Sequence, residues 1–272
     1  MKTLLSSIAL FLVLSSCGSE NKEVGLKQEV KPGLEVEYLQ SYSKKTGELG
    51  NVIEYDFIQT YKGKVLANTF QIPDYRARTI LKEPDFEGDY MEVLLKSAID
   101  DSISIKVDLK SLPLEQLPKG LEGKEGTLDF IITIRDIWNE EEIIDGMVNR
   151  LTDGKPDLWT KTGRGVRIFW DEKGDGEKAE FGDSVKIHVK GLFPTGAPFM
   201  STFDKKPIEF LLGEGLISPK AWEDACALVS KGDKLTVISP YDMAFGAVDR
   251  KPILKYSILV FEIDVVDVIK PY

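Results

Sequence analysis

The sequence predicts an α+β protein in which an antiparallel sheet packs on a short helix, and it predicts this arrangement twice. The first observation is an internal repeat with a nearly constant offset. One offset relates Val52 to Val185, Gly63 to Gly196, Thr69 to Thr202 and Phe70 to Phe203, and an offset smaller by two positions relates Leu128 to Leu259, Phe130 to Phe261, Ile132 to Ile263 and Asp136 to Asp267. The second observation is that strand-like segments far outnumber helical ones, and the helix falls between hairpins. A chain of 272 residues has room for two such domains.

Residues 1–16 predict a secretory signal peptide rather than a part of the fold. Lys2 supplies its positive charge, and the apolar run at 4–14 is too short to span a bilayer. The sequence LSSCGS at 14–19 then resembles the lipobox of bacterial lipoproteins, which implies that Cys17 becomes the lipidated first residue. The alternative is an ordinary secretory signal with a cysteine nearby. Because no Asp follows Cys17, the resemblance implies a lipid anchor in the cell envelope, by default the outer membrane, on its periplasmic or surface face.

The first domain is predicted over residues 34–139, after a polar tether at 17–33 that lacks hydrophobic periodicity. Its strands are expected at 52–58, at 103–107, where isoleucine and valine alternate with polar residues, and at 128–137. A turn at Gly63 follows the first of these strands, and residues 90–98 predict a short amphipathic helix. The order of these elements predicts an antiparallel sheet with one helix in the first domain.

Residues 140–165 predict a helical linker. Asn139 is a suitable N-cap and is followed by three glutamates, which favour the first turn of a helix. The apolar stripe of that helix is Ile143, Ile144, Met147, Val148 and Leu151. The second domain, at 166–270, repeats the order of the first, with a turn at Gly196, a helix at 219–229, and strands at 235–239 and 257–268.

Composition excludes several classes of function. The net charge is -10 and the basic residues are scattered, which argues against a nucleic-acid partner. The single histidine, His188, has no second histidine at a metal-ligand spacing and is expected to be a strand residue opposite Tyr55 in the repeat, so no metal or cofactor is expected. Apart from Cys17 the only cysteine is Cys226, which excludes an internal disulfide and predicts a small core residue. The G-x-G-x-x-A match at 174–179 is not followed by a helix and predicts a turn.

Seven segments of the second domain occur in an order and spacing that resemble the FKBP-type peptidyl-prolyl cis-trans isomerases. They are FGDSV at 181–185, GAPFMSTF at 196–203, PIEFLLG at 207–213, LISPKAWE at 216–223, KGD at 231–233, SPYDMAFGA at 239–247 and ILVFEI at 258–263. The resemblance implies a bent antiparallel sheet wrapped around one short helix, with an aromatic ligand pocket between them. The first domain is identified as a member of the family through its match to the second.

Carried over residue by residue, the resemblance assigns a site. It implies catalytic roles for Trp222 as pocket floor and for Phe199, Phe245 and Phe261 as walls. It implies substrate-binding roles for Val189, Met200, Ile208, Phe210, Leu216, Ile217 and Ile253, with the backbone N–H of Ile217 holding a peptide carbonyl. The partners are then proline-containing polypeptide segments. The alternative interpretation is that these aromatic residues only form the core of the domain, and it applies above all to Phe210.

The chemistry needs little more than a dry apolar pocket. The peptide bond has a rotational barrier of about 18–20 kcal/mol because of its partial double-bond character, and the twisted transition state has less charge separation than the planar bond. An apolar site therefore favours the transition state, without nucleophile or proton shuttle. Three departures from the family pattern weigh against turnover: Met200 replaces an Asp, and Val189 and Phe245 replace tyrosines. The alternative to an isomerase is a non-catalytic chaperone or peptide-binding lipoprotein. No oligomeric state is indicated.

The first domain is expected to be a non-catalytic copy. The repeat places Leu66 opposite Phe199, Ala67 opposite Met200 and Tyr90 opposite Trp222, so that only Phe130, opposite Phe261, keeps its aromatic wall. The stretch 111–126 has no counterpart of the AFG loop at 244–246. A spacer or a peptide-binding surface is the predicted role.

Overall fold

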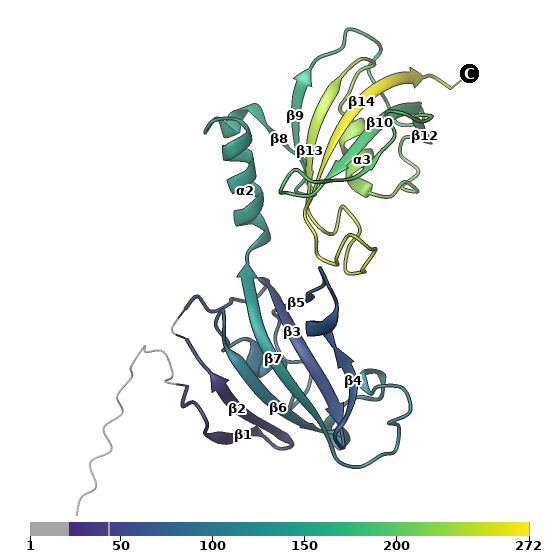
Figure 1. The fold of residues 1–272 in the computed structure, drawn as a ribbon. Coiled ribbons are helices and arrows are strands. Elements are labelled where there is room, and N and C mark those ends of the chain that lie inside the picture. Colours follow the sequence, from purple (N-terminus) through teal and green to yellow (C-terminus); the bar gives the residue numbers. More distant parts are fainter. Residues whose placement is uncertain (1–21, 43, 272) are drawn as a thin grey trace, which may run out of the picture.

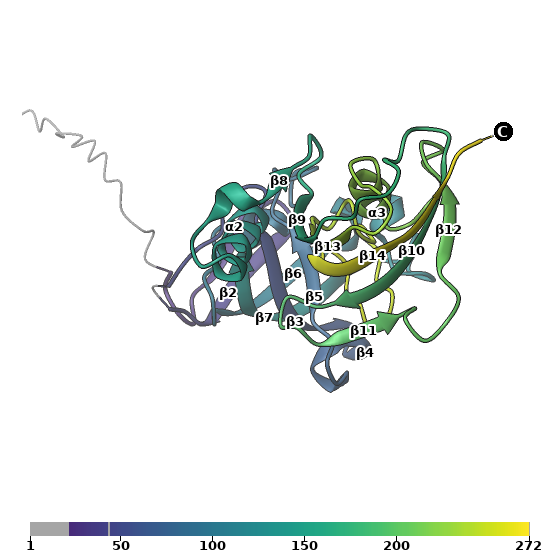
Figure 2. The ribbon, with the colours of Figure 1, turned by 90° about the horizontal axis from the view of Figure 1, so that it is seen from above.

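The computed structural model describes residues 22–42 and 44–271, so the predicted signal peptide and Cys17 lie outside the described residues. Within these residues the chain forms two antiparallel sheets of seven strands each, in two domains joined by one long helix (Figure 1). The predicted fold class, α+β with two antiparallel sheets and short helices, is confirmed. A view at right angles shows the second sheet curving around its helix α3 (Figure 2).

The first sheet has the order β1-β2-β6-β7-β3-β4, with β5 paired to β3. Its elements are β1 (Lys27–Lys31), β2 (Leu34–Gln40), β3 (Val52–Tyr61), β4 (Lys64–Asn68), β5 (Ala77–Ile80), α1 (Met91–Leu94), β6 (Ser102–Asp108) and β7 (Thr127–Trp138). Single 3-10 turns lie at Thr69–Gln71, Leu109–Ser111 and Leu114–Gln116.

The second sheet has the order β11-β10-β14-β13-β9-β8, with β12 paired to β10. Its elements are β8 (Thr160–Lys161), β9 (Arg167–Glu172), β10 (Ser184–Leu192), β11 (Pro198–Ser201), β12 (Ile208–Leu211), α3 (Lys220–Cys226), β13 (Lys234–Ser239) and β14 (Leu259–Ile269). The connecting helix is α2 (Glu140–Leu151), and a 3-10 turn at Pro156–Leu158 leads from it to β8.

The prediction that residues 17–33 are only a tether is wrong for their second half. Strand β1 lies within this range and pairs with β2 in antiparallel register through a turn at Pro32 and Gly33. Gly33 has a φ of 77°, a conformation that glycine adopts without steric cost. Because β1 is an edge strand that is largely exposed, it carries polar residues on both faces and shows no hydrophobic alternation.

Both domain helices are shorter than the sequence predicts. In place of 90–98 and 219–229, regular helix covers only α1 and α3. The chain then tightens, because Ser97 N–H bonds to the carbonyl of Leu94 and Leu228 N–H to that of Ala225, a spacing of three residues rather than four. The apolar pattern therefore continues past the end of the α-helix.

The strand register corrects the repeat offset. Glu54 pairs with Asp136 in the first sheet and Lys186 with Asp267 in the second, and both ladders shift immediately after this pair. These pairs place Tyr55 opposite Ile187, and not opposite His188 as predicted, so the offset along this strand is smaller by one position than the sequence comparison assigns. The assigned offset holds beyond the hairpin, because one more residue lies between the paired residues Gly191 and Met200 than between the equivalent pair, Gln59 and Ala67.

Helix α2 packs on the second domain. Its residues Ile144, Met147 and Val148 are buried with Trp159 and Ile258 in a small cluster of their own. Asn139 caps it as predicted, its side chain accepting from the N–H of Glu142 at 3.1 Å. The predicted stripe is too wide, because Ile143 and Leu151 remain 40% and 52% exposed. No helix among the described residues has the length and apolar character needed to cross a bilayer.

Candidate functional site

The candidate site is centred on Trp222 and Phe261. Helix α3 buries one face, on which Ala221, Trp222, Ala225 and Cys226 lie, against the sheet. The indole of Trp222 stands edge-on to the Phe261 ring on β14, with centroids 5.5 Å apart and an interplanar angle of 87°. This is a favourable geometry for an aromatic pair. Trp222 is 4% exposed and Phe261 is fully buried, so the floor of the site is closed by its neighbours.

The β10–β11 hairpin supplies one wall. Phe199 on β11 lies 6.3 Å from Phe261 and 5.2 Å from Phe193, measured between ring centroids. Gly191, which pairs with Phe261 across the sheet, makes this approach possible. A Cβ at residue 191 would lie 2.5 Å from the Phe199 ring and 2.8 Å from the Met200 side chain. The glycine is therefore required for the ring to rest on the strand.

The loop between β13 and β14 supplies the opposite wall. It is docked to the start of α3 by a hydrogen bond of 2.9 Å from the N–H of Ala221 to the carbonyl of Met243. Ile253 in this loop is buried and Phe245 is half-buried, both against the core of the second domain. The guanidinium of Arg250 lies 5.2 Å from the centroid of the Phe245 ring, a cation–π contact that covers the outer face of this aromatic.

The third border is the loop before α3, and a buried carboxylate holds it. Glu223 is 8% exposed, and its Oε1 accepts from the N–H groups of Gly213 at 2.7 Å and Gly215 at 3.0 Å. Ile217, at the end of this loop, packs against the core, and its backbone N–H donates no hydrogen bond within the described residues. Sequence reasoning missed Glu223, although a glutamate on the buried face of a helix that follows a glycine-rich loop was a usable signal.

The structure brings ten of the eleven predicted site residues into one cluster. Four of them are fully or nearly fully buried: Val189, Trp222, Ile253 and Phe261. Six are partly buried and pack against the buried core of the second domain: Phe199, Met200, Ile208, Phe210, Ile217 and Phe245. Leu216 is apart from the others, 82% exposed in its loop. Because Trp222 is nearly fully buried, a ligand that reaches it must displace neighbouring side chains.

The ten predicted residues in the cluster include no ionisable side chain, so their chemistry is that of apolar contact and backbone hydrogen bonding. The indole Nε1 of Trp222 is buried and has no hydrogen-bond partner among the described residues, which is an unusual state for a buried donor. Val189 directs its N–H to the hydroxyl of Thr202 at 2.8 Å. Within the described residues no three His, Cys, Asp or Glu side chains are placed to hold a metal ion.

The fold and the site together define a class: an α+β domain whose sheet wraps one helix and which offers an aromatic, uncharged surface to its ligand. Residues 175–266 match the family model described as FKBP-type peptidyl-prolyl cis-trans isomerase. The match is confined to the second domain.

Individual relatives bear names that agree with that match. The chain is 24% identical over 184 residues to the FKBP-type peptidyl-prolyl cis-trans isomerase FkpA of Buchnera aphidicola subsp. Schizaphis graminum, covering 66% of this chain and 69% of that protein. It is 30% identical over 175 residues to FkpA of Escherichia coli K12, covering 64% of this chain and 63% of that protein. The crystal structure of FkpA from Escherichia coli superposes with a TM-score of 0.40 and 24% identity, covering 47% of this chain and 59% of that one.

Proposed function

We propose that the second domain is a peptidyl-prolyl cis-trans isomerase that acts on Xaa-Pro bonds of exported proteins through the cluster around Trp222. The observation that carries this proposal is the contact of Trp222, Phe199 and Phe261, which come from three separate elements inside the segment that matches the family model. Relatives of this chain bear the name of this activity.

The geometry suits the reaction. An apolar environment stabilises the twisted amide relative to the planar one, because the planar bond has the greater charge separation. A prolyl ring needs such a surface to lie on, and the half-buried rings of Phe199 and Phe245 provide it. The backbone N–H of Ile217 has no partner within the described residues and borders the same cluster, so it is a suitable donor for a substrate carbonyl.

A second candidate function is binding without turnover, as a chaperone or assembly factor. It is favoured by the three positions where the family pattern has polar groups. Val189 is fully buried, Met200 packs its side chain beside Gly191, and Phe245 has no hydroxyl. The apolar surface for a proline is kept, whereas side-chain donors that could act on the twisting amide are missing.

The proposed location is the cell envelope, with the protein anchored by a lipid on Cys17, which lies outside the described residues. An outer-membrane anchor follows from the absence of Asp after Cys17. Slow prolyl isomerisation limits the folding of exported proteins as it does in the cytoplasm, so the activity fits this place. Metabolic labelling with a fatty acid, compared between the native chain and Cys17→Ser, tests the anchor.

The activity is tested with the full chain in a protease-coupled prolyl-peptide assay. We expect Trp222→Phe to lower kcat/KM by about tenfold or more, because the ring that supports the transition state changes size and place. Trp159→Phe is the matched control, since Trp159 is also a buried tryptophan whose Nε1 has no partner among the described residues, yet it lies in the cluster beneath α2.

Three outcomes decide between the candidates. Enhancement that falls in Trp222→Phe and not in Trp159→Phe supports the isomerase. Saturable binding of the same peptides with no enhancement over the uncatalysed rate supports binding without turnover and overturns the isomerase. Equal losses in both variants would show a general effect of core damage and would remove Trp222 from the site.

A further inference from the structure

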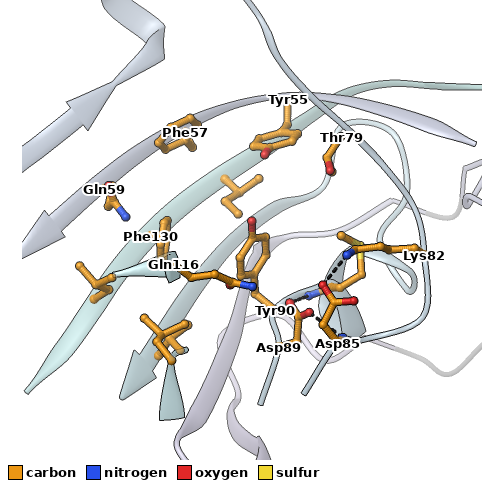
Figure 3. Close-up of a pocket in the computed structure, with 15 residues that line it drawn as sticks. Tyr55, Phe57, Gln59, Thr79, Lys82, Asp85, Asp89, Tyr90, Gln116 and Phe130 are labelled. Carbon is orange, nitrogen blue, oxygen red and sulfur yellow. Dashed lines mark hydrogen bonds and ion pairs between the residues drawn. The ribbon is translucent and has the colours of Figure 1, made fainter. Parts of the chain in front are cut away.

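The first domain contains a cavity at the place where the second has its aromatic cluster. This first-domain cavity has a volume of about 420 Å³ and is bordered by Tyr90 and Phe130, the residues that stand where Trp222 and Phe261 stand in the second domain (Figure 3). Their rings are stacked with centroids 5.9 Å apart. Such a volume is within the range of small-ligand sites.

The cavity is open because the residues that close the second site are smaller or absent here. The hairpin register puts Leu66 and Ala67 at the positions of Phe199 and Met200, which removes an aromatic ring and a long side chain. The stretch 111–126 folds in part around a separate small cluster with Leu109, Leu121 and Leu128, and it contributes Leu112 and Gln116 to the lining of the cavity.

Two phenol hydroxyls enter this cavity. Figure 3 shows Tyr55, from β3, and Tyr90, from the start of α1, reaching into it from opposite sides. Neither hydroxyl has a hydrogen-bond partner among the described residues. Burial raises the pKa of both tyrosines, so both keep their protons at any physiological pH. Both hydroxyls face the space of the cavity, which leaves two donors for a guest or for water.

The charges at the mouth restrict the guest. Lys82 is paired with Asp85, and the buried carboxylate of Asp89 accepts from the N–H groups of Asp85 and Met91, both at 3.0 Å. With one lysine against two aspartates the mouth has an excess of negative charge, which disfavours an anion. The hydroxyls can donate to an acceptor, and a carbonyl oxygen supplies one. Phe57 and Phe130 add apolar walls. The fitting guest is uncharged, apolar and equipped with a carbonyl oxygen.

We propose that the first domain binds neutral, apolar peptide segments in this cavity, with one side chain between Tyr90 and Phe57 and a backbone carbonyl accepting hydrogen bonds from the hydroxyls of Tyr55 and Tyr90. The site needs no proline, because nothing in it selects a tertiary amide. It does not rest on the proposed isomerase of the second domain, and it gives the protein a second, independent hold on an unfolded chain.

The test uses methionine methyl groups as reporters in the full chain. Met91 lines the first-domain cavity, whereas Met200 and Met243 belong to the second cluster. A proline-free, N-acetylated and C-amidated pentapeptide of alanine with a central leucine is titrated into protein with ¹³C-labelled methionine methyls. We expect the NMR signal of Met91 to shift and saturate, while the signals of Met200 and Met243 follow weakly or not at all.

Hydroxyl deletion makes the test specific. Tyr55→Phe and Tyr90→Phe keep the rings and are each expected to weaken binding by about threefold to tenfold, the effect of one hydrogen bond. Tyr61→Phe is the matched control on the same strand, because the Tyr61 hydroxyl bonds to the carbonyl of Glu125 outside the cavity, and it should leave the dissociation constant unchanged. Replacing the central leucine by aspartate should abolish the Met91 shift.

The possible results separate this proposal from the isomerase. Shifts confined to Met200 and Met243 would overturn the first-domain site, whatever the isomerase assay gives. A Met91 shift that is equal in native, Tyr55→Phe and Tyr90→Phe proteins would also overturn it, because the hydroxyls carry the recognition. A Met91 shift that persists in Trp222→Phe, together with loss of isomerase activity there, would establish two independent sites.

Discussion

Thr202 holds Val189 in the second sheet by the same bond with which Thr69 holds Phe57 in the first. In both cases the threonine hydroxyl oxygen accepts the strand's backbone N–H at 2.8 Å. Both threonines are nearly fully buried, at 9% and 4% exposure. The bond fastens the residue that follows β11 to β10, and the residue that follows β4 to β3. Both domains have it, although their aromatic residues differ.

Removal of this hydroxyl should destabilise the second domain. Thr202→Val keeps the shape of the side chain but leaves the Val189 N–H without its partner, which costs about 1–3 kcal/mol of unfolding free energy. Thr202→Ser keeps the oxygen and should cost less. Urea unfolding of the full chain measures both. An unfolding free energy that is the same for Thr202→Val as for the native chain would contradict the assigned role of the bond.

The bond also explains what the sequence could and could not reveal. Thr69 and Thr202 could be matched from the sequence, because both copies of the repeat keep a threonine where its hydroxyl bonds to the backbone. The offset assigned to β3 and β10 was one position wrong, since the extra residue of the second hairpin lies in a loop, where sequence places no constraint on pairing. Hydrophobic pattern alone also could not show β1, which is an exposed edge strand.

For the candidate site, residue types were easier to predict than openness. Ten of the predicted residues, Trp222 among them, share one cluster because apolar side chains at these positions are buried in the core of the second domain. The sequence analysis placed the ligand pocket in the second domain, yet in the structure the larger side chains of Phe199 and Met200 occupy the positions at which the first domain has the smaller Leu66 and Ala67 beside its cavity. Cavity volume depends on the sum of many side chains and is not encoded at any one position.

Glu223 is predicted to act as a positioning residue. Glu223→Ala removes the acceptor for Gly213 and Gly215 and should loosen the loop that carries Ile217, whereas Glu223→Gln keeps one acceptor oxygen. We expect KM to rise about threefold to tenfold in Glu223→Ala with little change in kcat, because the loop contributes to binding. Faster hydrogen exchange at the amides of Gly213 and Gly215 is the accompanying structural signature. A loss in kcat alone would refute the role.

The polar groups that the family pattern has and this chain lacks can be restored. Met200→Asp and Phe245→Tyr each introduce one such group at a half-buried position beside the cluster. We expect the double variant to raise kcat/KM by more than the product of the two single effects, since a lone carboxylate would be left without a donor. The comparison is made with the same prolyl peptide. A double variant no faster than the native protein would mean that these departures do not limit the rate.

Cys226 is predicted to be inert. It is fully buried, and burial together with the charge of Glu223 raises the pKa of its thiol to about 12. Because only the thiolate reacts, a rise of this size lowers the reactive fraction at neutral pH by about three orders of magnitude. A thiol reagent should therefore modify Cys226 in urea but not in the native protein. Rapid modification of the native chain with Cys17→Ser would show that α3 opens.

The stability of the protein should decrease as the pH rises from about 5 to 8, and Glu140 is the group responsible. Burial raises the pKa of Glu140 to about 7 from its ordinary 4.5, with Asp242 and Glu141 adding to the effect, although the N–H of Tyr241 donates to its carboxylate at 2.7 Å. A raised pKa means that the folded state prefers the protonated form, so the contribution is complete below pH 4.5 and is lost as the pH passes 7.

The Glu140 carboxyl is only partly buried, so solvent screening weakens its effect. Its contribution to the unfolding free energy should therefore change by about 1 kcal/mol over this pH range, less than the full shift in pKa implies. Glu140→Gln should abolish this part of the pH dependence, and unfolding temperatures of both proteins between pH 5 and 8 measure it. Glu142→Gln, in the same first turn and exposed, is the control that should keep the native profile. If native and Glu140→Gln proteins lose stability in parallel over this range, the effect arises from another group and the carboxyl is charged throughout.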